Sequence, residues 1–143
     1  MPQLSNIESA FVAYRHSGED PEVLRPMLQA VVDVLGRAGV NSYCTFFEEE
    51  KFQAEGRTRR EIMDHAFEMI RERDMLFVVK HSTEISEGMM MEVGMAREAG
   101  IPVVVAVQEE VKNEGYLPEM GDFAFSWTDE DDLASKIRTL PFA

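Results

Sequence analysis

The sequence predicts an α/β domain in which a parallel β-sheet is covered by helices on both faces. Short apolar runs of strand length recur along the chain, and between them stand segments with apolar residues at three- and four-residue spacings. Strands that alternate with helices in this way imply right-handed crossovers and a parallel sheet. Five strands in this pattern favour the doubly wound, flavodoxin-like (Rossmann-like) order 2-1-3-4-5. At 143 residues, we expect residues 1–143 to form a single domain.

The first strand and helix are expected at the N-terminus. Residues 9–14 form an apolar run that is typical of a buried strand. Asp20 followed by Pro21 is a common helix start, and the helical spacing of apolar residues continues as far as Gly36. Pro26 is a point at which this helix either bends or begins late.

The second strand and helix follow. Residues 40–47 are rich in β-branched and aromatic side chains, which predicts a strand, and a polar loop is expected from there to Gly56. Thr58, with Glu61 three residues later, has the spacing of a capping box and predicts a helix start.

The second half of the chain supplies three more strands. Residues 74–79 and 101–107 are continuous apolar runs of the kind that a sheet buried on both faces requires, and residues 86–100 form the helix between them. The acidic stretch 108–121 is expected to be a loop with one helical turn at most. Residues 122–127 predict a short fifth strand, after which Thr128 is expected to cap the last helix.

Composition excludes several classes of function. The net charge of −13 repels polyanions, so DNA or RNA binding is not expected, although a small anion can still be held by local contacts. Cys44 is the sole cysteine, and the N-terminus has neither a basic segment nor an apolar signal core. We therefore expect a cytoplasmic protein that does not enter a membrane. The ten methionines lack His or Cys at metal-ligand spacing, so no metal is expected. The sequence has neither a Walker loop nor a Gly-x-Gly-x-x-Gly fingerprint, so no other cofactor is expected.

One acid, Glu92, stands on a helix that is otherwise apolar or small over most of its first two turns. In sheets of the predicted order, ligands bind beyond the carboxyl ends of the strands, and the helix 86–100 begins at that edge. A carboxylate buried there must be hydrogen-bonded, have a perturbed pKa or line a pocket. The alternative is a glutamate on the solvent side of the helix.

The start of the same helix has two readings. Ser86 can cap it, and Gly88 lets a ligand approach backbone N–H groups that carry partial positive charge. The alternative is an ordinary serine cap, which Glu87 favours because its charge would repel a phosphate. Gly88 and Ala96 lie four residues before and after Glu92, which leaves room for a ring.

The segment Ser86-x-Gly-x-x-x-Glu92-x-Gly-x-Ala-x-x-x-Gly-x-Pro102 resembles the signature of nucleoside 2-deoxyribosyltransferases and the related nucleotide N-glycosidases. The resemblance extends in motif and element order along nearly the whole chain. It implies that Glu92 attacks the anomeric carbon of the sugar, that Ser86 contacts the 5′ group, and that the protein forms homodimers or larger assemblies. Family members commonly carry an Asp on the second helix where this chain has Ala66.

The loop after the first strand, Ala13-Tyr-Arg-His-Ser-Gly-Glu-Asp20, resembles a second family, the TIR domains. Many of these cleave NAD with a glutamate that corresponds to Glu92, and others only assemble with partner domains. Both resemblances lead to cleavage of an N-glycosidic bond by Glu92.

Further substrate-binding candidates come from the loops at the ligand edge. Arg15 and His16, followed by Ser17, place cations where a phosphate or carboxylate could bind, unless the loop is simply solvated. Tyr14 is either a core residue or a partner of Glu92. Phe47 or its neighbour could stack on a base.

These observations predict an enzyme that cleaves or transfers at the N-glycosidic bond of a nucleoside or nucleotide, with Glu92 as nucleophile or stabiliser of the oxocarbenium ion. The competing prediction is a TIR-like module, either NAD-cleaving or limited to binding and signalling. Ala66 is the residue that favours the second prediction.

Overall fold

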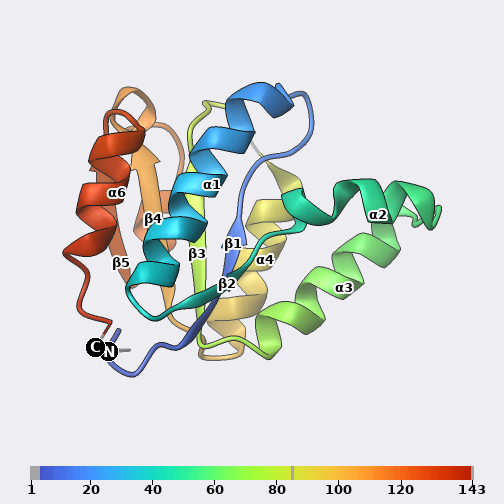
Figure 1. The fold of residues 1–143 in the computed structure, drawn as a ribbon, viewed down its shortest axis with the longest axis horizontal. Coiled ribbons are helices and arrows are strands. Elements are labelled where there is room, and N and C mark those ends of the chain that lie inside the picture. The colour runs from blue at the N-terminus through green and yellow to red at the C-terminus, as the bar shows by residue number, and fades with distance from the viewer. Residues whose placement is uncertain (1–3, 85, 143) are drawn as a thin grey trace.

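A computed structural model describes residues 4–84 and 86–142. The sheet has five parallel strands in the order β2-β1-β3-β4-β5, so the predicted α/β fold and strand order are confirmed (Figure 1). The strands are β1 (Ser9–Ala13), β2 (Asn41–Tyr43), β3 (Met75–Lys80), β4 (Val103–Gln108) and β5 (Phe123–Trp127). The carboxyl ends of all five strands meet at one edge, which is where ligands bind in such folds.

Helices cover both faces of the sheet (Figure 1). Helices α1 (Pro21–Arg37) and α6 (Glu130–Arg138) pack on one face, and α3 (Arg59–Arg71) and α4 (Glu87–Glu98) pack on the other. Each face buries its own apolar cluster because successive strand residues point to opposite sides. In β3, Phe77 and Val79 face α1, whereas Leu76 and Val78 face α4. The core therefore fixes where α4 starts relative to the strand ends.

The second strand is shorter than predicted. Residues 40–47 were expected to be one strand, but β2 ends at Tyr43 and a 3-10 helix, η1 (Thr45–Glu48), takes the rest. The N–H of Phe47 donates to the carbonyl of Cys44 at 3.2 Å, which closes the turn. This turn buries Phe46 (7% exposed) in the core and leaves Phe47 43% exposed, whereas a continued strand would follow the sheet past its edge.

The expected polar loop after residue 47 is also partly helical. The run Glu-Glu-Lys-Phe-Gln-Ala forms α2 (Glu49–Ala54), because these are good helix formers and Phe52 anchors them in the core. Beyond β4, the predicted loop contains the short helices η2 (Glu109–Val111) and α5 (Leu117–Met120).

Most of the predicted helix starts are present. Asp20 accepts a hydrogen bond from the N–H of Glu22, and Thr58 and Glu61 form the expected capping box. Pro26 lies inside α1 without delaying its start at Pro21.

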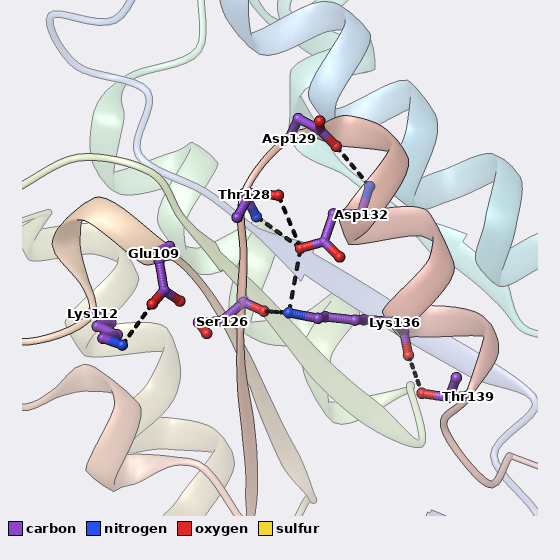
Figure 2. A network of polar contacts seen from close by, with 8 residues as sticks. All are labelled: Glu109, Lys112, Ser126, Thr128, Asp129, Asp132, Lys136 and Thr139. Atoms are coloured by element: carbon purple, nitrogen blue, oxygen red, sulfur yellow. Dashed lines mark hydrogen bonds and ion pairs between the residues drawn. The ribbon is translucent and has the colours of Figure 1, made fainter.

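The cap of the last helix is Asp129, so the prediction of Thr128 was wrong by one residue. Figure 2 shows that the Asp129 carboxylate accepts from the N–H of Asp132, at 2.8 Å. Thr128 instead donates its own N–H to the Asp132 carboxylate, at 2.9 Å. Lys136 pairs with Asp132 and donates to the carbonyl of Ser126, which ties α6 to β5.

Gly121 is required by the close approach of α5 and the sheet. A Cβ at this position would lie 2.7 Å from the carbonyl oxygen of Phe123 and 2.9 Å from Cγ2 of Val105. We expect Gly121→Ala to lower the free energy of unfolding by about 1–3 kcal/mol, measured by urea denaturation. Gly36→Ala is the control, because no atom lies within 4 Å of its added Cβ, and it should stabilise by about 0.5–1 kcal/mol. Equal effects of the two substitutions would contradict this account.

Candidate active site

Glu92 lies in the second turn of α4 and is buried, with 7% of its surface exposed. Within residues 4–84 and 86–142 its carboxylate makes no hydrogen bond or ion pair. Burial disfavours the charged form and raises the pKa of Glu92 to about 8. The alternative of a solvent-facing glutamate is therefore wrong. The side chain has instead the perturbed pKa that a buried, unpaired acid must have.

Tyr14 and Cys44 lie close enough to Glu92 for its charge to act on both. Both are buried, and the negative charge of Glu92 contributes to the pKa shift of each. Burial, followed by the charge of Cys44, raises the pKa of Tyr14 far above its usual value, while a hydrogen bond with Thr45 opposes this rise. Burial is also the main reason why the pKa of Cys44 is raised to about 12. At neutral pH the tyrosine and the thiol are therefore neutral neighbours of Glu92.

Aromatic side chains from η1 continue this group outward. The Phe46 ring meets Tyr14 at a centroid distance of 5.9 Å and Phe47 at 5.2 Å, in both cases edge to face. His16 lies 6.1 Å from the Tyr14 ring and 3.9 Å from the carboxylate of Glu49. Tyr14, His16 and Phe47, all predicted from the sequence, thus share one side of the ligand edge with Glu92.

Arg15 is turned toward an internal acid. Its Nη1 lies 2.5 Å from Glu19 Oε1, and the other Glu19 oxygen lies 3.1 Å from His81 Nε2. Burial alone would raise the pKa of Glu19, but hydrogen bonds from Arg15 and His81 outweigh it and lower that pKa. This carboxylate thus joins the loop after β1 to the loop after β3. The contact of Arg15 with substrate stays a prediction.

Ser86, Gly88 and Ser17 have surroundings of their own. Ser86 Oγ accepts from the N–H of Met89 at 3.2 Å, so it caps α4 as expected. A Cβ on Gly88 would lie 3.0 Å from Cε of Met63, so the space beside this glycine is used to pack α4 against α3. Ser17 is exposed in the first loop. Substrate contacts of these three residues also stay predictions.

Ala66, which stands where the resemblance places an Asp, is 3% exposed in the core between α3 and the sheet. Its neighbour His65 points elsewhere, since its Nε2 lies 2.8 Å from the hydroxyl of Tyr43. Glu49 is another acid near Tyr14 and Cys44, because after burial its charge also contributes to the raised pKa of each.

A cavity of about 430 Å³ lies elsewhere on the ligand edge, near the ends of β4 and β5. Glu92 does not line it. Its walls are formed by Val23, Met27, His81, Gln108, Trp127, Thr128, Asp129, Glu130 and Asp131. Three of these residues, Asp129, Glu130 and Asp131, are acidic, so this cavity is poorly suited to an anion.

Sequence reasoning missed four residues of the edge: Glu19, Arg25, Glu49 and His81. Arg25 lies on α1 with its guanidinium carbon 5.2 Å from the centroid of the Phe46 ring. Neither this contact nor the place of Glu49 had a signal in the sequence, because both depend on the turn at η1. The pair of Glu19 and His81 joins positions far apart in the chain, which periodicity does not reveal. The described part of the chain contains no cluster of three or more His, Cys, Asp or Glu side chains that could hold a metal ion. Nor does any helix within it have the length and hydropathy needed to cross a membrane.

The fold and the buried acid define an α/β protein with a carboxylate at the ligand edge of a doubly wound sheet. The model of the family described as nucleoside 2-deoxyribosyltransferase matches residues 22–130, which is more than half of the chain. The chain therefore belongs to the nucleoside 2-deoxyribosyltransferase family, and the resemblance inferred from the sequence is confirmed. Membership supports chemistry at the N-glycosidic bond of a nucleoside or nucleotide.

Two solved structures share the fold. One is the CMP N-glycosidase BcmB of Clostridium botulinum, with a TM-score of 0.67 and 15% identity over 90% of this chain and 96% of that one. The other is a conserved protein from Enterococcus faecalis V583, with a TM-score of 0.58 and 16% identity over 92% of this chain and 98% of that one. No curated protein sequence matches this chain significantly. At these identities the two structures support the fold alone.

Proposed function

We propose that this protein cleaves the N-glycosidic bond of a nucleoside or nucleotide and that Glu92 is its nucleophile or oxocarbenium stabiliser. The observation that carries the proposal is a buried carboxylate, without a described partner, on α4 at the ligand edge of a chain in this family. A buried carboxylate without a partner destabilises the fold when it ionises, and a group with such a perturbed pKa is typical of a functional site. The name of the Clostridium botulinum protein, a CMP N-glycosidase, is in keeping with this chemistry.

The reaction follows from the chemistry of a carboxylate beside a sugar. As the bond between C1′ and the base nitrogen breaks, its electron pair leaves with the base, which takes up a proton, and positive charge develops on the sugar. An ionised Glu92 either stabilises that charge or bonds to C1′ through a carboxylate oxygen. In the second case, water then releases the sugar and regenerates the carboxylate, or the nitrogen of another base does so. If water accepts the sugar, the protein is a hydrolase; if another base accepts it, the protein is a transferase.

The residues around Glu92 suit the remaining parts of such a substrate. Tyr14 is neutral at neutral pH and lies within the electrostatic range of Glu92, so its hydroxyl is a candidate for positioning Glu92 or a sugar hydroxyl. Phe47 is 43% exposed and packs edge to face on Phe46, so its free face is available for stacking on a base. Ser86 and Gly88 would hold the sugar or its 5′ group, with Arg15, His16 and Ser17 on the opposite loop.

A TIR-like module is the second candidate function, and Ala66 is the observation that favours it. The residue lies in the core, so α3 supplies no second carboxylate at that position. A TIR-like protein would either cleave NAD with the same Glu92 or act only through binding.

The test is base release. The purified protein is incubated separately with nucleosides, 2′-deoxynucleosides, their 5′-monophosphates and NAD, and free base is measured by chromatography. Repeating each reaction with a second base as acceptor separates transfer from hydrolysis. We expect release from at least one nucleoside or nucleotide. Release from NAD alone would support the TIR-like candidate, and no release from any substrate would refute catalysis on this panel.

Assembly and location stay predictions. Met90 and Met91 of α4 are 39% and 50% exposed, as expected if they pack against another copy of the chain. A homodimer or larger assembly would appear in sedimentation velocity. The cytoplasmic location predicted from composition would be checked by cell fractionation.

A further inference from the structure

The basic side chains at the ligand edge differ in whether they are free to bind an anion. Arg15 already pairs with Glu19, at 2.5 Å. Lys80, at the end of β3, is 7% exposed and donates to the carbonyl of Glu114. Arg25 is exposed, and among the residues that the structure describes it pairs with no carboxylate.

Arg25 is held by an aromatic ring instead of an acid. Its guanidinium carbon lies 5.2 Å from the centroid of the Phe46 ring, in a cation–π arrangement. Stacking on a buried ring restricts the long side chain, while the planar N–H donors remain available at its edges. Arg25 is therefore positioned for a ligand in advance.

Arg25 also lies near the candidate active site, one aromatic ring away from Tyr14. It stands in the second turn of α1, the helix that follows β1 at the ligand edge. The Phe46 ring that carries it contacts Tyr14 at 5.9 Å and Phe47 at 5.2 Å. One aromatic side chain thus separates Arg25 from Tyr14, the neighbour of Glu92, and from the exposed Phe47.

This arrangement pairs an exposed ring with a free cation, and it suits a ligand with an aromatic base and a phosphate. The protein carries a net charge of −13, so the average field opposes a dianionic phosphate and a local cation is needed to hold one. An arginine can bind a phosphate through two parallel hydrogen bonds.

We propose that Arg25 is a specificity-determining residue that binds the 5′-phosphate of a nucleoside monophosphate. This inference rests on the proposed function and names the substrate class of the same site. The stacked guanidinium selects monophosphates over nucleosides without taking part in bond cleavage.

The test compares Arg25→Gln with the unaltered protein on matched pairs of nucleoside and 5′-monophosphate. We expect kcat/KM for the monophosphate to fall about 10- to 100-fold, as for loss of hydrogen bonds to a charged group, with kcat/KM for the nucleoside nearly unchanged. Because both substrates are measured on the same preparation, partial unfolding cancels in their ratio. Added salt should raise KM for the monophosphate in the unaltered protein and much less in the variant.

Arg37→Gln is the matched control, since it removes the same charge from the last turn of the same helix. Its ratio of monophosphate to nucleoside kcat/KM should not change. An unchanged ratio in Arg25→Gln, an equal change in both variants, or a nucleoside preference in the unaltered protein would overturn the inference. Each of these outcomes includes base release, so each leaves the proposed function standing. Absence of release from every substrate would instead refute the proposed function.

Discussion

Glu92→Gln should lower kcat/KM for base release by on the order of 10³-fold or more, because an amide can neither form the glycosyl ester nor stabilise the oxocarbenium charge. The fold should persist, since glutamine has nearly the same shape and burial already favours the uncharged acid at this position. The measurement is the rate of base release on the substrate found with the unaltered protein, together with a thermal melt of the variant.

Glu87→Gln provides the control for this substitution. Glu87 is exposed in the first turn of the same helix, so the change removes a charge from α4 without touching the buried group. Its activity should stay within about twofold of the unaltered protein, as for most surface substitutions. If Glu92→Gln released base as fast as Glu87→Gln does, the carboxylate of Glu92 would have no role in the reaction.

The strand order was predictable because its causes are local. Apolar runs such as residues 75–79 must be buried on both faces, and caps such as Asp20 and Thr58 mark helix starts by side-chain chemistry alone. The turn at η1 was not predictable in this way. Its residues have strand propensity, and the burial of Phe46 under Arg25 and beside Tyr14 overrides that propensity.

The candidate site likewise has some features that the sequence reveals and others that it does not. Glu92 was found because an acid directly after three methionines and among small residues conflicts with burial, which is visible in the sequence itself. The contacts of Glu19 with Arg15 and His81 were not predicted, since they require the loops after β1 and β3 to meet. The approach of Met63 to Gly88 was not predictable either, because Met63 comes from another helix.

The buried acid should also make the stability of the protein depend on pH. The pKa of Glu92 is about 8 in the folded protein, compared with 4.5 for the exposed side chain. Between these two values the folded state binds more protons than the unfolded state, so the free energy of unfolding falls as pH rises. The loss should be complete above about pH 8 and should reach roughly 4–5 kcal/mol, a large part of the stability of an ordinary domain.

Other titrating groups affect the free energy of unfolding in other pH ranges. The pKa of Glu19 is lowered on balance, because hydrogen bonds from Arg15 and His81 outweigh its burial, so its stabilisation is lost only as pH falls below the usual range of a carboxyl group. Burial lowers the pKa of Lys80, which makes its contribution change at alkaline pH. A comparison of two variants that differ only at residue 92 removes both effects.

Urea denaturation of the unaltered protein and of Glu92→Gln at pH 5, 7 and 9 measures the term that belongs to Glu92. Any cost of burying the glutamine amide is the same at each pH, whereas the cost of ionising the glutamate grows as pH rises from 4.5 to about 8. The variant should therefore gain roughly 4 kcal/mol relative to the unaltered protein between pH 5 and pH 9. Base release should rise over the same interval, because the reaction needs the ionised carboxylate and kcat/KM reports the pKa of the free enzyme. Parallel stability curves for the two proteins would show that Glu92 ionises without penalty, and an acid of that kind would not be the buried, unpaired group on which the proposed reaction depends.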